Sequence, residues 1–456
     1  MYRKIFPARS RWLKRVRRPG LTALLAMNRL AAMHSTGSSA SPSSLALAGY
    51  RICDFTGQLA GAGATRWLAS FGAEVIRIED PVKKGSWDIL RGSPPFKDER
   101  RGTEFGSGFN NHNIEKLGIT LNLRTERGKE LLRELVAVSD VVSENFAAGV
   151  LERLGLGFDE LQRIRADIIY VSNCGFGQTG PYREFKSWGP IAQAVSGLTY
   201  SSGLAGEEPA GWGFSYMDHT GGYYMAIAIL MALWHREQTG EGQWVDMSCT
   251  EAGAGLHGAD LLDWSVNGRS QRAPDRPASN RSSSPVMAPH GVYRCKGDDN
   301  WLALSCRSDD EWVTVRSLLV ASGVEAERVA GMDSLSARLA RQDELDALIT
   351  EWTCTRIRWE LERLLLDGGV PAAAVRRPAE RIDGDIATAR RGLWPVVDHP
   401  AMGAVRVDGQ PVQFSETDWS IARAAPILGQ HNRQVYGGIL GLTEPEIDEL
   451  LAEGII

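Results

Sequence analysis

Cysteine is scarce and scattered in this sequence. The 456 residues contain six cysteines, with no Cys-x-x-Cys pair and no histidine cluster at metal-ligand spacing. This pattern disfavours a structural zinc site and a disulfide framework, and it is typical of a protein from a reducing compartment. We therefore expect no bound metal.

Long apolar runs and concentrated basic surfaces are also missing. The longest apolar run, residues 223–234, is shorter than the roughly 20 residues that cross a bilayer, and we expect it to form a buried helix. The formal net charge is −5, and no basic stretch is interleaved with aromatic residues. A small-molecule substrate is thus the expected partner, with no nucleic acid and no membrane.

Acidic residues are absent from the first 53 positions, which carry ten Lys and Arg residues. We expect residues 1–45 to be a disordered basic extension. A transit peptide or a start assigned too far upstream would both give this composition. Without an import signal, the expected location is the cytoplasm.

Strand-like and helix-like segments alternate over the first half of the chain. The expected strands are residues 50–55, 74–79, 118–123, 140–143 and 168–172, and the expected helices are residues 64–71 and 126–138. Such alternation is typical of an α/β fold with a doubly wound, Rossmann-like parallel sheet. We assign residues 46–255 to this large domain.

Composition changes after residue 268, where Arg, Ser, Pro and Asn gather. We interpret residues 256–289 as a linker. Residues 290–390 then form a smaller α+β domain that begins with a hairpin around residues 296–299. Residues 391–456 return to the large domain and end in a helix over 444–452.

Asp218 is the most informative acidic residue, because the stretch Asp218-His219-Thr220-Gly221-Gly222 directly precedes the long apolar run. A carboxylate held in a dry site can attack an acyl group and form a mixed anhydride. However, an Asp before an apolar helix is also an ordinary N-cap. Taken alone, the motif favours the capping role.

Two other motifs allow a ligand-binding or a structural interpretation. Gly61-Ala62-Gly63 with a later Glu79 imitates a dinucleotide-binding turn, but Arg66 stands where the third glycine belongs. Glu144-Asn145-Phe146, followed by Arg153, is either a strand end with solvated charges or a loop that binds a base and a phosphate. The residues by themselves leave the second choice open.

A set of motifs in fixed order resembles the class III CoA-transferases, the family of formyl-CoA transferase and of the carnitine and bile-acid CoA-transferases. The resemblance runs from about residue 48 to the C-terminus. Its motifs are Asp54-Phe55-Thr56, Gly72 to Glu79, Leu117 to Leu123, Glu144-Asn145-Phe146, Gly175 to Tyr182, Asp218 to Gly222, Ala288 to Tyr293 and Ala425 to Gly429.

The resemblance implies an interlocked homodimer of two-domain subunits with the active site between the domains. It makes Asp218 the nucleophile that passes through aspartyl anhydride and aspartyl-CoA thioester intermediates. It places coenzyme A, a substrate here, against Leu59, Ala60, Leu121, Arg124, Asn145, Phe146 and Arg153. No cofactor is expected, because the thioester energy is conserved in the exchange.

The sequence departs from formyl-CoA transferase at Leu59 and Cys174, where that enzyme has a glutamine and a basic residue, and it has no clear counterpart of that enzyme's glycine-rich loop. These differences put the formyl and oxalate substrates in doubt. We expect succinyl-CoA or another dicarboxylic partner. Its polar contacts are sought among Tyr216, His219, Thr220, Arg281 and His290.

Three alternatives remain beside the transferase. An α-methylacyl-CoA racemase of the same fold needs a histidine where this sequence has Trp188. A non-catalytic CoA-binding paralogue would not need the motif at Asp218. An NAD enzyme would not have Arg66 in its glycine fingerprint.

Overall fold

Six short strands form a single parallel sheet. In the computed structural model they are β1 (Arg51–Asp54), β2 (Glu74–Glu79), β3 (Leu117–Thr120), β4 (Val141–Glu144), β5 (Ile169–Cys174) and β6 (Trp244–Ser248). Their order across the sheet is β3-β2-β1-β4-β5-β6. This is the strand order of a Rossmann-type sheet, so the expected α/β class is confirmed, with its topological switch point between β1 and β4. The structure describes residues 45–202, 206–213, 215–272, 280–282 and 284–456.

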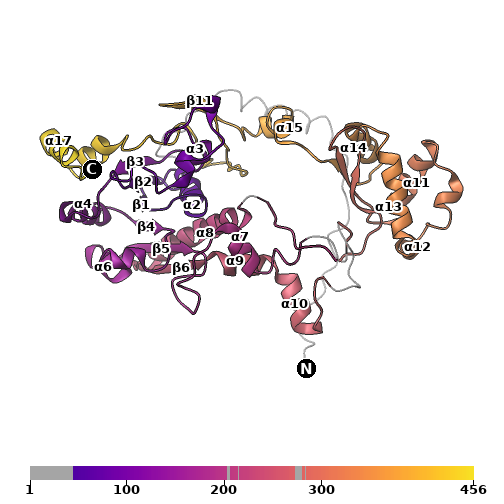
Figure 1. Ribbon diagram of the computed structural model, residues 1–456, viewed down its shortest axis with the longest axis horizontal. Helices are drawn as coiled ribbons and strands as arrows, with labels where there is room; N and C mark the ends of the chain where they lie inside the picture. The colour runs from indigo at the N-terminus through magenta and orange to yellow at the C-terminus, as the bar shows by residue number, and fades with distance from the viewer. Residues whose placement is uncertain (1–44, 203–205, 214, 273–279, 283) are drawn as a thin grey trace. The chain divides into compact units, whose positions relative to one another are not determined.

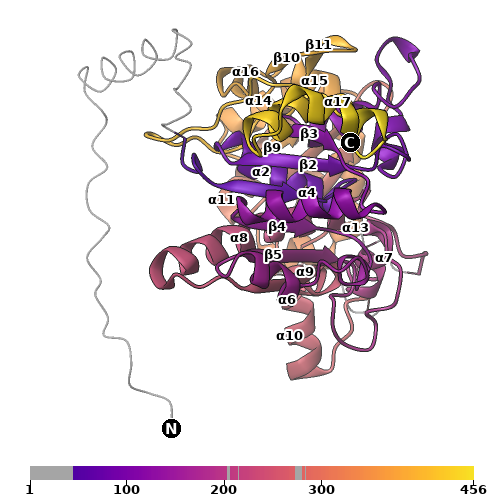
Figure 2. The same cartoon turned by 90° about the vertical axis from the view of Figure 1, so that its left-hand side faces the viewer.

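Helices cover both faces of the sheet because successive strand residues point to opposite sides. Ile52, Val75 and Val141 pack against α2 (Ala60–Ser70) and α8 (Tyr216–Thr239). Their strand neighbours face α4 (Glu126–Ala137), α6 (Phe158–Ile164) and α17 (Glu444–Ala452). Figure 2 shows α17, α4 and α6 in front of the strands.

The end of the chain protects the edge strand β3. The N–H of Gly118 donates to His431 Nδ1 at 3.0 Å, and the N–H of Thr120 donates to Asn432 Oδ1 at 2.9 Å. Next to the strand, the N–H of Asn122 donates to the carbonyl of Ile455 at 2.7 Å. These bonds satisfy backbone groups that would otherwise be open for pairing with another chain.

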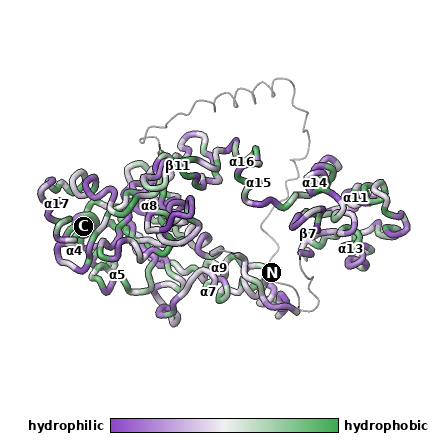
Figure 3. Tube along the Cα trace, turned by 45° about the horizontal axis from the view of Figure 1, so that its top comes forward, coloured by the Kyte–Doolittle hydropathy of each residue, from purple (hydrophilic) through white to green (hydrophobic). Residues whose placement is uncertain are grey.

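A second hydrophobic core lies in residues 288–370. Its antiparallel sheet consists of β7 (His290–Arg294), β8 (Trp301–Ser305) and β9 (Ala372–Ala374). The helices are α11 (Asp309–Ala321), α12 (Leu335–Ala340), α13 (Gln342–Thr353) and α14 (Arg358–Asp367). Polar and apolar residues alternate along this part of the tube in Figure 3, as expected for helices with one buried side.

The remaining elements are short or irregular. They are α3 (Ser107–His112), α5 (Val150–Arg153), α7 (Gly189–Val195), α9 (Cys249–Leu256), α10 (Gly258–Asn267), α15 (Pro378–Ile382), α16 (Ile386–Arg390), β10 (Val396–His399) and β11 (Gly403–Arg406), with single turns at Ile89–Gly92, Lys97–Glu99, Ala326–Val329 and Arg433–Gly437. Figure 1 labels α3, α7, α9, α10, α15 and β11 among them. None of the helices in the described ranges is both long enough and apolar enough to cross a membrane.

Several element boundaries differ from the sequence predictions. Helix α2 begins at Ala60 instead of residue 64, so Gly61 and Gly63 lie inside it. Strand β6 has no predicted counterpart, and the proposed linker contains helix α10. The predicted strand at 74–79 and the closing helix at 444–452 match the structure. The predicted extension at 1–45 lies, except for Leu45, outside the described residues.

The predicted helix over 223–234 is present, but the prediction that it is buried is wrong for one of its sides. Helix α8 runs from Tyr216 to Thr239, and Ile227, Met231 and Trp234 are 53%, 67% and 69% exposed. Apolar residues go all the way round this helix, but only one side of it meets the sheet. The other side leaves a large apolar surface uncovered in the single chain.

Gly222 of α8 provides a test of the helix packing. A Cβ at Gly222 would lie 2.6 Å from the carbonyl oxygen of Ala60 in α2, so Gly222→Ala should lower the free energy of unfolding by about 1–3 kcal/mol. Urea unfolding measures the change. Gly255 in α9 has no neighbour within 4 Å of such a Cβ, so Gly255→Ala should change stability by less than about 1 kcal/mol. Equal losses in both variants would contradict the close contact between α2 and α8.

Candidate active site

The turns after β1 and β4 meet at the switch point of the sheet. The side-chain amide of Asn145 donates to the carbonyl of Gly57 at 2.9 Å, and its oxygen accepts the N–H of Gly57 at 2.7 Å. This two-way bond fixes both turns to each other. In open α/β sheets, ligands bind in the crevice at this point.

A buried ionic group lies under the first turn. Asp54 accepts hydrogen bonds from the N–H of Thr56 at 3.1 Å, the hydroxyl of Ser143 at 2.9 Å and Lys116 Nζ at 3.2 Å. Burial acts to raise the pKa of Asp54, but Lys116 and Arg77 outweigh it and hold that pKa below its ordinary value. Burial lowers the pKa of Lys116 to about 8. Removing either partner would leave an uncompensated buried charge, which is strongly destabilising. The pair therefore holds the first turn in place.

Asp218 lies in the first turn of α8. Ser215, with a φ of 49°, is the N-cap residue, so Asp218 lies inside the helix and does not have the capping role that the motif taken alone favoured. Burial raises the pKa of Asp218, while the nearby Ser215 hydroxyl, the His219 ring and the N–H of Gly189 oppose that rise. The helix dipole also favours a negative charge at this end. The carboxylate is thus half-buried and oriented, without a salt bridge among the described residues.

A cavity of about 300 Å³, named here the Asp218 pocket, brings these parts together. Its walls are Gly57, Gln58, Leu59, Ala60, Trp87, Asn145, Phe146, Ala147, Asn173, Cys174, Gly175, Ser187, Trp188, Gly189, Ala192, Asp218 and Cys249. Asp218 is the one charged side chain in that lining. Four predicted coenzyme A contacts therefore share a cavity with the predicted nucleophile.

The two thiols in the pocket do not compete with Asp218 as nucleophiles. Burial raises the pKa of Cys174 to about 11 and that of Cys249 to about 12. The thiolate is the reactive form of cysteine, and it is nearly absent at neutral pH with such values. Asp218 is left as the ionisable group able to attack an acyl carbon in this pocket.

A second cavity of about 340 Å³, named here the Arg124 pocket, adjoins the first. It is lined by Phe55, Ile78, Glu79, Asp80, Lys83, Trp87, Leu121, Leu123, Arg124, Phe146, Val150 and Leu154. Trp87 and Phe146 belong to both linings, and their ring centroids are 5.6 Å apart. An elongated ligand can thus run from Asp218, past two aromatic rings, to the cations Lys83 and Arg124.

The predicted coenzyme A contacts divide between the two pockets. Leu59, Ala60 and Asn145 line the first, Leu121 and Arg124 line the second, and Phe146 lines both. Arg153 lines neither of them. Its guanidinium donates to the carbonyl of Ala148 at 3.3 Å.

The residues expected to contact a substrate carboxylate do not line the Asp218 pocket. His219 faces the His112 ring at 5.5 Å, and the Thr220 hydroxyl donates to the carbonyl of Tyr216 at 3.0 Å. Successive helix residues point about 100° apart, so the neighbours of Asp218 face other surroundings. Arg281 forms salt bridges with Asp343 and Asp346, and His290 Nδ1 lies 2.6 Å from the carbonyl oxygen of Asn280.

Trp87 and Gly189 are site residues that sequence reasoning missed. The Trp87 ring lies so close to the first turn that a Cβ at Gly57 would be 2.5 Å from it. A side chain at Gly189 would collide with the Asp218 carboxylate. Both contacts join segments far apart in the chain, so no local pattern marks them.

The dinucleotide interpretation fails on two side chains. Glu79, which would have to bind a ribose, is buried and accepts a hydrogen bond from Arg91 Nε at 2.8 Å. Arg66, at the third glycine position of the fingerprint, is buried in α2 and donates to the carbonyl of Asp408. Glu79 is therefore not free to bind a ribose, and Arg66 stands where the fingerprint needs a glycine for close helix packing.

No group of three or more His, Cys, Asp and Glu side chains is arranged to hold a metal ion among the described residues.

Comparison with known proteins identifies the family. The model of CoA-transferase family III matches residues 47–432. The chain belongs to this family. It is 31% identical to the succinyl-CoA–L-malate CoA-transferase beta subunit of Chloroflexus aurantiacus over 418 residues, which cover 90% of this chain and 98% of that protein.

Two further relatives support the assignment to family III. The formyl-CoA:oxalate CoA-transferase of Streptomyces coelicolor is 31% identical over 421 residues, covering 90% of this chain and 99% of that enzyme. The crystal structure of a CAIB/BAIF family protein from Brucella suis has a TM-score of 0.77 and 30% identity, covering 87% of this chain and 99% of that one. The resemblance found in the sequence motifs is therefore confirmed.

Proposed function

We propose that this family III protein moves coenzyme A from an acyl-CoA donor to a carboxylic acid, with Asp218 as the nucleophile. The observation that carries the proposal is the Asp218 carboxylate, the one charged group lining a cavity formed at the switch point of the sheet. The lining of that cavity holds no Lys, Arg or His, so no cation of the cavity wall neutralises the carboxylate.

The reaction follows from that position in four steps. Asp218 attacks the thioester carbonyl, which forms a mixed anhydride and releases the CoA thiolate. The thiolate attacks the aspartyl carbonyl and releases the first acid, leaving an aspartyl-CoA thioester. The acceptor carboxylate attacks that thioester, and the thiolate released then attacks the acceptor acyl carbon, which restores Asp218. Each step exchanges one acyl bond for another, so no external energy source is required.

The two adjoining pockets support a single binding mode for coenzyme A. Its thioester end lies at Asp218, the pantetheine arm passes Trp87 and Phe146, and the nucleotide phosphates approach Lys83 and Arg124. Arg124 is exposed and only loosely paired with Asp80 at 3.7 Å, so it is available to a phosphate.

A racemase of the same fold is the less favoured function. Proton exchange at an α-carbon needs a second acid or base opposite Asp218. The described lining of the Asp218 pocket holds no histidine, no lysine and no second carboxylate, and Trp188 lies in its wall. A purely binding role is disfavoured by the oriented, solvent-accessible carboxylate.

Succinyl-CoA is the first donor to test. It is named as a substrate of relatives that act on L-malate, D-citramalate and mesaconate. Formyl-CoA and oxalate are the alternative pair, named for the Streptomyces coelicolor enzyme.

We also propose that the chain works as an interlocked homodimer. The uncovered apolar side of α8 supports this assembly, since Met231 and Trp234 are more than half exposed in the single chain. Sedimentation velocity should give about twice the chain mass of 49.9 kDa. A monomer at micromolar concentration would contradict the proposal.

Asp218→Asn should lower CoA exchange by about 10⁴-fold or more, because the nucleophile of the covalent steps is lost. Mass spectrometry after incubation with succinyl-CoA should show a hydroxylamine-sensitive adduct on Asp218 in the unmodified protein and none in the variant. The exposed Asp310 gives a control, and Asp310→Asn should keep both signals. Full exchange by Asp218→Asn would reject the mechanism.

A ligand series separates the two ends of the binding site. Trp87→Ala should weaken acyl-CoA and acyl-pantetheine alike, by about ten-fold, because both ligands contain the arm that meets the ring. Arg124→Ala should weaken acyl-CoA by about three- to ten-fold and leave acyl-pantetheine unchanged, since only acyl-CoA carries nucleotide phosphates. Arg127→Ala, on the exposed side of α4, serves as the charge control. Equal effects of Arg124→Ala on both ligands would contradict this orientation.

A further inference from the structure

Glu144 is a buried acid directly before the loop that lines both pockets. It ends β4 and is 2% exposed. Its carboxylate accepts three hydrogen bonds: from the N–H of Phe146 at 2.6 Å, from Gln178 Nε2 at 3.1 Å and from the Tyr170 hydroxyl at 3.2 Å. A group with three converging donors is arranged for the ionised state.

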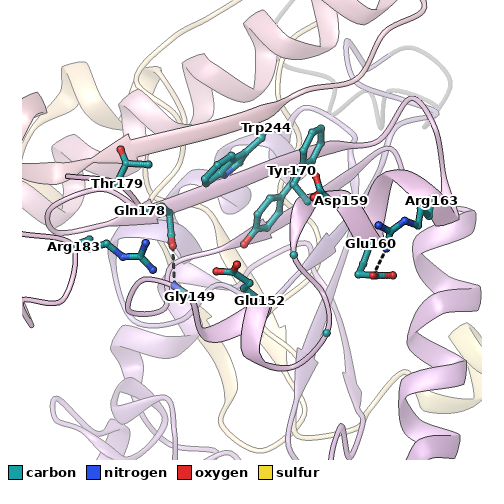
Figure 4. A pocket seen from close by; sticks show the side chains of 13 residues that line it. Gly149, Glu152, Asp159, Glu160, Arg163, Tyr170, Gln178, Thr179, Arg183 and Trp244 are labelled. Atoms are coloured by element: carbon teal, nitrogen blue, oxygen red, sulfur yellow. Dashed lines mark hydrogen bonds and ion pairs between the residues drawn. The ribbon is translucent and has the colours of Figure 1, made fainter. Parts of the chain in front are cut away.

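These bonds connect two segments of the active site. Gln178, which donates to Glu144, also accepts the N–H of Gly149 at 2.9 Å, as Figure 4 shows. Its own N–H donates to Asp246 Oδ1 at 2.7 Å. Glu144 therefore ties the loop at 145–149 to the segment that follows β5.

Both connected segments line the Asp218 pocket. Phe146 and Ala147 come from the first, and Gly175 comes from the second. Phe146 also faces Trp87 in the passage to the Arg124 pocket. The direct bond from Glu144 to the Phe146 N–H thus acts on the ring that both pockets share.

The surroundings of Glu144 disfavour its ionised form. Burial raises the pKa of Glu144 to about 7, and the nearby carboxylate of Asp246 on β6 acts in the same direction, while the hydrogen bonds from Phe146 and Tyr170 oppose them. Burial also raises the pKa of Tyr170 on β5, so that hydroxyl stays a proton donor. Among the described residues no Lys, Arg or His forms a salt bridge with Glu144.

Solvent comes close to this group from the other side. A cavity of about 520 Å³, shown in Figure 4, is lined by Gly149, Tyr170, Gln178 and Trp244 among others. Tyr170 and Gln178 donate hydrogen bonds to Glu144, and the N–H of Gly149 donates to Gln178. Protons can therefore be exchanged without passing the Asp218 pocket.

We propose that Glu144 is a positioning residue whose ionised carboxylate holds Phe146 in place for the coenzyme A ester, so that uptake of one proton by Glu144 weakens ester binding. The inference rests on the proposed function. A neutral carboxyl group must donate its own proton to a neighbour, so it can no longer accept all three hydrogen bonds. The bond to the Phe146 N–H also loses its charge assistance.

The direction of the pH effect follows from the same chemistry. Above pH 7 Glu144 is mainly ionised and the loop is held. As the pH falls through about 7, the protonated fraction rises and the affinity for the ester should fall. Loss of one charge-assisted bond predicts a weakening of about five-fold between pH 8 and pH 6.

Glu144→Gln tests the proposal on the full chain. Its amide oxygen can accept the Phe146 N–H, but its NH₂ group cannot accept from Gln178 or Tyr170. The KM for succinyl-CoA should be raised at pH 8 and should lose most of the pH dependence that the unmodified protein shows, while kcat and the labelling of Asp218 stay unchanged. The phosphates of the ligand titrate equally with both proteins, so the difference between the profiles belongs to Glu144.

Two other variants sharpen the result. Glu152→Gln changes an exposed acid of the neighbouring cavity and should keep the original pH profile. Tyr170→Phe removes one donor to the ionised form, so the midpoint of the pH profile should move to higher pH. This variant also keeps the test decisive if Glu144→Gln does not fold.

The outcomes separate the two proposals. An unchanged pH profile in Glu144→Gln or an unmoved midpoint in Tyr170→Phe, with normal labelling of Asp218, would overturn the role of Glu144 alone. A loss confined to kcat would overturn it as well, because a positioning residue for the ester acts on KM. If the unmodified protein neither binds succinyl-CoA nor other acyl-CoA esters and no label reaches Asp218 at any pH, the proposed function itself fails.

Discussion

The site depends on the clamp between the turns after β1 and β4. Asn145 exchanges two hydrogen bonds with Gly57, and the charged pair of Asp54 and Lys116 lies beneath them in the buried part of the sheet. A parallel sheet brings the carboxyl ends of these strands to one edge, but the clamp decides the distance between the two turns. The Asp218 pocket can exist only because that distance is fixed.

Close helix packing brings Asp218 to this clamp. Gly222 lets α8 touch the backbone of α2, and Gly221 lies against the thiol of Cys249, with no room for a side chain at either position. The first turn of α8 lies close to Gly189 at the start of α7, where a Cβ would be 2.4 Å from Asp218 Oδ2. Both glycines after Asp218 therefore allow the close packing that places its carboxylate in the pocket.

A common physical pattern links Asp218 with Glu144. Burial raises the pKa of each acid, and neither forms a salt bridge among the described residues. We propose that the first carboxylate attacks the thioester and that the second makes a binding loop depend on the state of one proton. Salt bridges are used elsewhere, as between Arg91 and Glu79, where the charge has a structural role.

The sequence by itself determined the alternation of strands and helices, because short β-branched runs and helical periods are local signals. It also indicated Asp218 and six further residues that line the two pockets, since ordered motifs carry a family resemblance. Only the tertiary structure decided that Trp87 and Gly189 belong to the site, that one side of α8 is exposed, and that Arg281 and Thr220 are occupied elsewhere. Those facts depend on contacts between residues far apart in the chain, and a local pattern contains no information about which distant group will fill the space beside it.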